Sequence, residues 1–84
     1  MSKPDELLEK VLDGDCDANI SFLGLRALLL RLGFRERVRG SHHFFRRPDG
    51  PGILNLQRRG HEVKPYQVRQ ARRLFVRLGI GGDR

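Results

Sequence analysis

The chain has 84 residues, one cysteine and a formal net charge of +7. This length allows one small domain and excludes a second catalytic domain or a large cofactor site. Because Cys16 is the only cysteine, intrachain disulfides and zinc-binding cysteine spacings are excluded, which fits a reducing cytoplasmic setting. No apolar stretch approaches the roughly 20 residues of a transmembrane helix, and the acidic N-terminal residues differ from those of a signal peptide.

The charge is unevenly distributed along the chain. Residues 1–20 contain two lysines and six acidic residues, whereas residues 21–84 contain fifteen Lys or Arg and four Asp or Glu. Arginine dominates the later part, and its planar guanidinium suits phosphate groups and stacks on bases. A compact basic domain of this composition indicates a nucleic acid or an acidic protein as the partner, rather than a merely soluble basic surface.

Three helices are predicted, near residues 3–13, 21–32 and 65–78. Apolar residues recur three or four positions apart in each, which places them on one helical face. Ser21 suits the N-cap of the second helix and Gly33 its termination. We expect a single domain over residues 1–84, in which residues 1–19 form an N-terminal helix and loop appended to a core of residues 20–80.

Three strands are predicted between the second and third helices, near residues 34–39, 42–47 and 53–57. Gly40-Ser41 and Pro48-Asp49-Gly50 are turn sequences that join them, and residues 58–63 are expected to form a polar loop. The expected fold is α+β, with a three-stranded antiparallel sheet covered on one face by two helices and open on the other. The residues expected to be most buried are Phe22, Leu25, Leu29, Leu54, Leu56, Val68 and Phe75.

The most informative segment is Gly40-Ser41-His42-His43-Phe44-Phe45. Consecutive residues of a strand point to opposite faces, so one histidine must face the helices and the other the open face. Strand alternation alone does not decide which, because a phenylalanine follows on each face. Arginines flank the segment on both sides, and three of them alternate along the preceding strand, at Arg35, Arg37 and Arg39.

A histidine among arginines can transfer a proton beside a bound polyanion. RNA cleavage needs a base for the 2′-hydroxyl, positive charge for the transition state and an acid for the leaving oxygen. Histidine can take either proton-transfer role near neutral pH. The sequence has no carboxylate cluster, His-x3-His pattern or evident nucleophilic triad, so no metal or cofactor is expected.

The segment Gly40–Phe45, preceded by Leu32-Gly33-Phe34, resembles the signature of the HicA family of bacterial toxins. The resemblance extends through residues 17–22, 54–57 and 64–70 and covers about residues 7–78. It implies a fold like that of double-stranded-RNA-binding domains, cleavage of messenger RNA, and growth arrest. It also implies a monomer when free and a hetero-oligomer with a HicB-type antitoxin that covers the site.

The family's catalytic histidine directly follows the Gly-Ser pair, which by resemblance is His42. The residues expected to bind RNA are Arg35, Arg37, Arg39, Gly40, Ser41, Arg46 and Lys64. The family usually has a proline and a histidine soon after the third strand, whereas this chain has Gln57-Arg-Arg-Gly-His61 there. We therefore expect His61 to be a loop residue.

Two other functions are compatible with the sequence. The first is a non-catalytic RNA-binding module, since the implied fold binds duplex RNA by shape and phosphate contacts. The second is an interaction protein whose basic face binds an acidic partner. The arginines of the last helix are expected to form a solvated face rather than part of an RNA groove.

Overall fold

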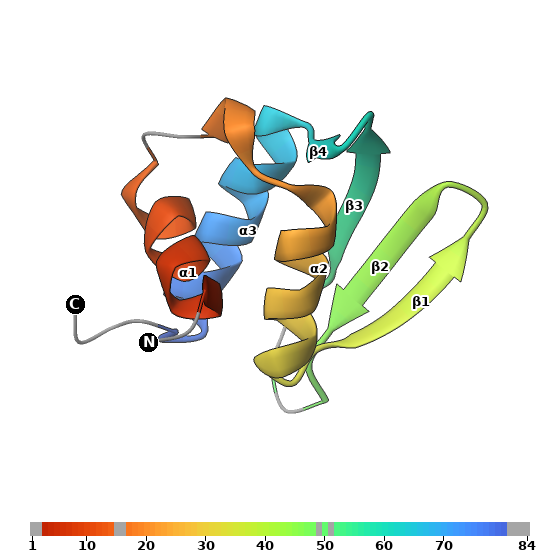
Figure 1. Ribbon diagram of the computed structural model, residues 1–84. Helices are drawn as coiled ribbons and strands as arrows, with labels where there is room; N and C mark the ends of the chain where they lie inside the picture. Colours follow the sequence, from red (N-terminus) through yellow and green to blue (C-terminus); the bar gives the residue numbers. More distant parts are fainter. Residues whose placement is uncertain (1–2, 15–16, 49, 51, 81–84) are drawn as a thin grey trace.

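The computed structural model describes residues 3–14, 17–48, 50 and 52–80. It contains helices α1 (Lys3–Asp13), α2 (Phe22–Arg31) and α3 (Pro65–Arg77), with one 3₁₀ turn, η1 (Asp17–Asn19). The strands are β1 (Arg35–Arg39), β2 (His42–Arg46), β3 (Leu54–Arg59) and β4 (Glu62–Val63), which form an antiparallel sheet in the order β1-β2-β3-β4. The helices all lie on one side of the sheet, so its other face is open (Figure 1). The expected α+β class is confirmed.

The core lies between the sheet and the helices. All seven residues that the sequence pattern predicted to be buried are buried, which confirms the helical and strand periodicities behind them. Phe45 from β2 and Phe34 before β1 join this core, as does Val11 from α1. No helix in the described part of the chain has the length and hydropathy needed to span a bilayer.

The three predicted strands are present, but residues 58–63, which were expected to form a polar loop, extend β3 and add a fourth strand. β3 continues to Arg59, and a turn at Gly60 and His61 returns the chain as β4. Gly60 has a φ of 63°, which a residue with a side chain rarely adopts. The polar composition hid this strand, because only Val63 of β4 is apolar and buried.

The β3–β4 hairpin also fixes the start of α2. The backbone N–H of Phe22 donates to the carbonyl of His61, and the N–H of Val63 donates to the carbonyl of Ile20, each at 2.9 Å. The guanidinium of Arg58 lies 5.2 Å from the centre of the Phe22 ring, a cation–π contact on the helix side of the sheet. Arg58 therefore covers core surface and does not face the open side.

Helix α3 is attached to β3 through a buried glutamine. Gln67 is 2% exposed, and its Oε1 accepts a 2.9 Å hydrogen bond from the backbone N–H of Gln57. Within β3, the partners of β4 are Arg58 and Arg59, so Gln67 supplies to Gln57 the acceptor that a neighbouring strand would otherwise provide. This contact holds the first turn of α3, and Lys64 at its N-cap, beside the open face.

We expect Gln67→Met to lower the free energy of unfolding by about 1–3 kcal/mol, because it leaves the Gln57 N–H without its acceptor. Denaturant unfolding of the two proteins would measure the difference. Gln70→Met, an exposed change on the same helix, is the matched control and should have little effect. Equal losses in the two variants would contradict this role for Gln67.

Candidate nucleic-acid interface

The strand register decides which histidine faces the open side. Residues paired across neighbouring strands lie on the same face, and Phe45 pairs with Leu54 in the core. His43 lies two residues before Phe45 and therefore faces the helices, whereas His42 faces the open side with Arg39, its partner in β1. This arrangement resolves the alternative that the sequence left open.

The open face carries an excess of positive charge. Five arginines of the sheet point to this side, whereas Glu62 is the one carboxylate of the sheet that points there. Arg35 and Arg46 are directly opposite each other, and like charges in that position destabilise a sheet. A bound polyanion would offset this repulsion. The side chains that share the open face are Arg35, Arg37, Arg39, His42, Phe44, Arg46, Asn55, Gln57, Arg59 and Glu62.

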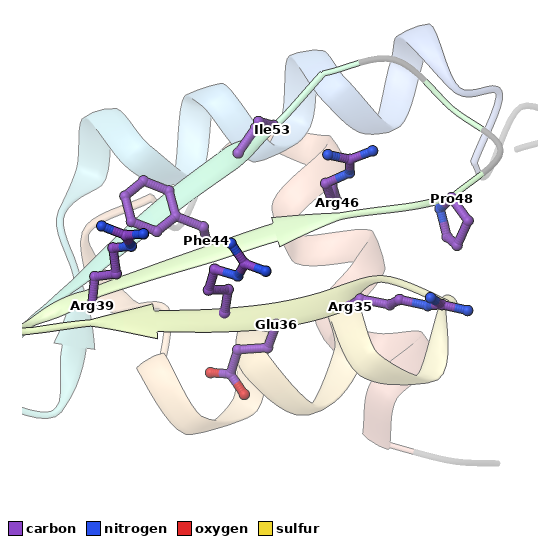
Figure 2. A pocket seen from close by; sticks show the side chains of 8 residues that line it. Arg35, Glu36, Arg39, Phe44, Arg46, Pro48 and Ile53 are labelled. Carbon is purple, nitrogen blue, oxygen red and sulfur yellow. The ribbon is translucent and has the colours of Figure 1, made fainter.

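A hollow of about 610 Å³ occupies the part of this face nearest β1, and we call it the first hollow. Phe44, Pro48 and Ile53 provide its apolar surface (Figure 2). Its basic residues are Arg35, Arg37, Arg39 and Arg46. Glu36 also borders the hollow, but Figure 2 shows its side chain pointing away from Phe44. An aromatic ring surrounded by arginines suits a nucleobase with its phosphates.

His42 lies beside the first hollow without lining it. Its ring stacks on Phe44, which does line it, with ring centroids 6.1 Å apart and an interplanar angle of 22°. Nδ1 of His42 lies 3.4 Å from Oδ1 of Asn55. This contact suits the tautomer with the proton on Nδ1, because an amide oxygen only accepts, and in that tautomer Nε2 of the neutral ring can accept a proton.

A chain of polar side chains runs next to His42 across the open face. Gln57 pairs with His42 in register, and its Nε2 lies 3.4 Å from the hydroxyl oxygen of Ser41. Nζ of Lys64 donates to Oε1 of Gln57 over 3.3 Å. Gln57 thus connects the residue before His42 to the cation at the N-terminus of α3. The site therefore combines a proton acceptor with an ammonium and a guanidinium, that of Arg39.

His43 has a different environment on the helix side. Its Nδ1 lies 2.8 Å from Oε2 of Glu36, and its ring meets that of Phe22 edge-on with centroids 4.8 Å apart. Arg26 of α2 binds both oxygens of the same carboxylate, with Nε 3.0 Å from each. His43 and Glu36 therefore attach the β1–β2 hairpin to α2.

The electrostatics of this cluster favour the ionised carboxylate. The hydrogen bonds from Arg26 hold the pKa of the Glu36 carboxyl below its usual range, with burial opposing this effect and His43 adding to it. The same carboxylate raises the pKa of Arg26 above its usual value. Glu36 is thus neutralised locally and adds little negative charge to the open face.

The structure brings together the residues that the sequence singled out. Arg35, Arg37, Arg39, Arg46 and His42 share one face, and Gly40 and Ser41 form the two-residue turn between Arg39 and His42. Gly40 has a φ of 57°, as the first position of a type II′ hairpin turn requires. Lys64 reaches the same place through Gln57.

Sequence reasoning missed Phe44, Asn55 and Gln57 as members of this site. Strand alternation had placed Asn55 and Gln57 on one face, but only the register shows that it is the face of His42. His61 lies exposed in the β3–β4 turn. Within the described residues, no group of three or more His, Cys, Asp or Glu side chains is placed to hold a metal ion.

Comparison with protein families identifies a family model that covers most of the chain. Residues 25–77, well over half of the chain, match the family model of the HicA toxin of bacterial toxin–antitoxin systems. No curated protein and no solved structure matches the chain. The matched segment runs from α2 to the end of α3, so it contains the whole sheet and all the open-face residues described above.

We expect Glu36→Gln to lower the free energy of unfolding at neutral pH and to lose this effect in acid. Since folding lowers the pKa of Glu36, its ionised form stabilises the protein above the ordinary value near 4.5. That contribution disappears as the pH falls through the lower pKa that Glu36 has in the folded protein. The charged groups that face the carboxylate are Arg26 and His43. Unfolding measured from pH 7 down to pH 3 would test this, with Glu9→Gln on the exposed side of α1 as the control. A difference between Glu36→Gln and wild type that is independent of pH would contradict it.

Proposed function

Because the chain belongs to the HicA family of bacterial toxins, we propose that it cleaves RNA as the toxin of a toxin–antitoxin pair, with His42 transferring the proton. The fold of the family is like that of double-stranded-RNA-binding domains, and the α+β architecture agrees with it. The observation that carries the proposal is the placement of His42 on the arginine-rich open face, while His43 is held against the helices.

The cleavage step follows from the groups beside His42. Nε2 of the neutral imidazole takes the proton of a ribose 2′-hydroxyl, and the 2′-oxygen forms a bond to the adjacent phosphorus. The bond from phosphorus to the 5′-oxygen of the next nucleotide breaks, and that oxygen takes up a proton from water, while His42 returns the proton that it took to solvent. The products are a 2′,3′-cyclic phosphate and a 5′-hydroxyl, so the step needs no oxidant or additional reactant.

The cations around His42 support this chemistry. Arg39 faces His42 directly in the register, and Lys64 is held nearby through Gln57. Positive groups fixed in this way stabilise the charge that develops on the phosphorus oxygens in the transition state. The stacking of His42 on Phe44 and its contact with Asn55 limit the rotation of the imidazole. The ring is thereby oriented before RNA binds.

Membership of a toxin–antitoxin family implies an antitoxin partner. We infer that this partner is of the HicB type and that it covers the open face. The exposed arginines of β1 favour a partner with acidic side chains, and such a partner would compete with RNA for the same charges. Binding of the antitoxin would then block cleavage by occlusion.

A non-catalytic RNA-binding module is the second candidate. The first hollow alone, with Phe44 and four arginines, could bind RNA without any reaction. In that case His42 would be a stacking residue and its imidazole would be replaceable by another planar side chain. The two functions predict the same binding and different cleavage, which a single variant separates.

His42→Ala should reduce RNA cleavage by about 10²–10⁴-fold, the usual contribution of one general acid–base group. It should also abolish growth arrest on induced expression, while the variant folds and still binds RNA through its arginines. Gel assays of a labelled RNA, with and without chelator, would measure the rate, and chelator should not change it. His61→Ala, which removes an exposed histidine, is the matched control. A folded His42→Ala protein that cleaves at the wild-type rate would favour the binding module.

RNA affinity should fall steeply with salt if the open-face arginines bind phosphates. The expected slope of log K against log salt is about −0.7 for each phosphate neutralised on a single strand. Replacing Arg35 and Arg46 with glutamine should weaken binding and make the slope less negative. Anisotropy titrations at several salt concentrations measure both effects. A slope near zero in the wild type would show that this face does not bind nucleic acid.

A further inference from the structure

A second hollow, of about 320 Å³, lies between β3 and α3. Residues 52–55 line it from the strand side, and Gln70, Arg73 and Arg77 line it from the helix. Ile53, an exposed side chain, borders this second hollow as well as the first. The two hollows therefore adjoin at Ile53, on the β3 side of the open face.

The helix wall of the second hollow is basic. Helix α3 contains four arginines and no acidic residue, and none of the residues that line the hollow is acidic. Arg72 donates a 2.7 Å hydrogen bond to the carbonyl of Val11 and so holds α1 in place. Arg73 and Arg77, one helical turn apart and both exposed, line the hollow instead. Arg72 therefore has a structural role, whereas Arg73 and Arg77 face the second hollow.

The strand wall offers a backbone donor as well. The N–H of Gln57 points toward α3, where it binds Gln67. Because the N–H groups of a strand alternate between its two edges, the N–H of Asn55 points to that same edge, beside the second hollow. β4 does not pair with β3 at this position, since its pairs are with Arg58 and Arg59. A backbone N–H at the edge of a strand can bind a phosphate oxygen.

Asn55 connects the second hollow to the proton-transfer site. Its side chain lies 3.4 Å from His42 on the open face, and the same residue lines the hollow next to α3. Phe44 makes the equivalent connection from the first hollow, because it lines that hollow and stacks on His42. A ligand that occupied both hollows would therefore contact Phe44 and Asn55, the two residues that touch His42.

We propose that single-stranded RNA crosses the open face roughly perpendicular to the strands, from the arginines of β1 into the second hollow, where Arg73 and Arg77 bind its phosphates. This inference rests on the proposed function and extends it to the path and form of the substrate. A base that stacks on Phe44 must be unpaired, and the path turns around the edge of β3 at Ile53, so a flexible single strand fits where a duplex does not. His42 flanks the strand between the two hollows.

The test uses the full chain carrying His42→Ala, so that RNA is bound and not cleaved. Anisotropy would measure its affinity for unstructured RNAs of about ten and about three nucleotides, lengths that should span both hollows or only one. Adding Arg73→Gln and Arg77→Gln should weaken binding of the longer RNA about tenfold and make its salt slope less negative by about 1.4, or 0.7 for each phosphate. Binding of the trinucleotide should not change.

The matched control carries Lys10→Gln and Arg31→Gln, which remove the same charge from exposed positions on α1 and α2. It should bind both RNAs within about twofold of the parent, as expected for distant charges screened by salt. Equal losses in the two double variants, or equal losses for the two RNA lengths, would overturn the path. The path would also be overturned if the variant at Arg73 and Arg77 bound RNA normally but lost affinity for poly-glutamate. The second hollow would then be a protein-docking site. If the parent binds no RNA at all, the proposed function fails together with the path.

Discussion

Phe45 is completely buried between the sheet and the helices, and its position fixes the direction of every other side chain in β2. Because neighbouring residues of a strand alternate, its burial turns Phe44 and Arg46 outward and places His42 on the open face with them. A shift of one residue in the register would bring His43 outward and bury a charged arginine. The pairing of Phe45 with Leu54 and with Glu36, through the two neighbouring strands, prevents such a shift. The packing of one phenylalanine thereby determines which imidazole can reach a ligand.

The two adjacent histidines lie on opposite faces of β2 and have different roles. On the helix side, the His43 ring lies between Glu36 and Phe22, where hydrogen bonding and packing attach a hairpin to a helix. On the open side, the long contact to Asn55 and the stacking on Phe44 orient the His42 ring without engaging both of its nitrogens. The strand therefore combines a rigid attachment on one face with an accessible imidazole on the other. We attribute the sequence His-His to these two requirements.

Much of this arrangement could be predicted from the sequence, because the core residues of the helices and strands follow strict periodicities. The helices at 3–13, 21–32 and 65–78 and the first three strands lie within two residues of their predicted ends. β4 could not be predicted, since its single buried residue, Val63, carries no periodic signal. The direction of His42 was undetermined because Phe44 and Phe45 are both apolar, and only the pairing with β3 identifies the buried ring.

The interface depends on contacts between different secondary-structure elements, which explains why part of it was missed. Gln67 and Gln57 are ten residues apart, and their hydrogen bond depends on how α3 packs on β3. The second hollow arises from the same packing, and two arginines of the exposed face of α3 line it together with residues of a strand. Amphipathic periodicity gives the face of a helix that is buried, but it does not identify which exposed residues adjoin a neighbouring element.

The opposition of Arg35 and Arg46 across β1 and β2 has a consequence for how long the protein persists. Two like charges in register make the bare face a source of instability. An anionic ligand that binds this face of the folded protein more tightly than it binds the unfolded chain offsets the repulsion and shifts the folding equilibrium toward the native state. Since proteases act mainly on unfolded chains, the occupied protein is degraded more slowly than the empty one. Ligand binding at this face is thus coupled to the turnover of the protein.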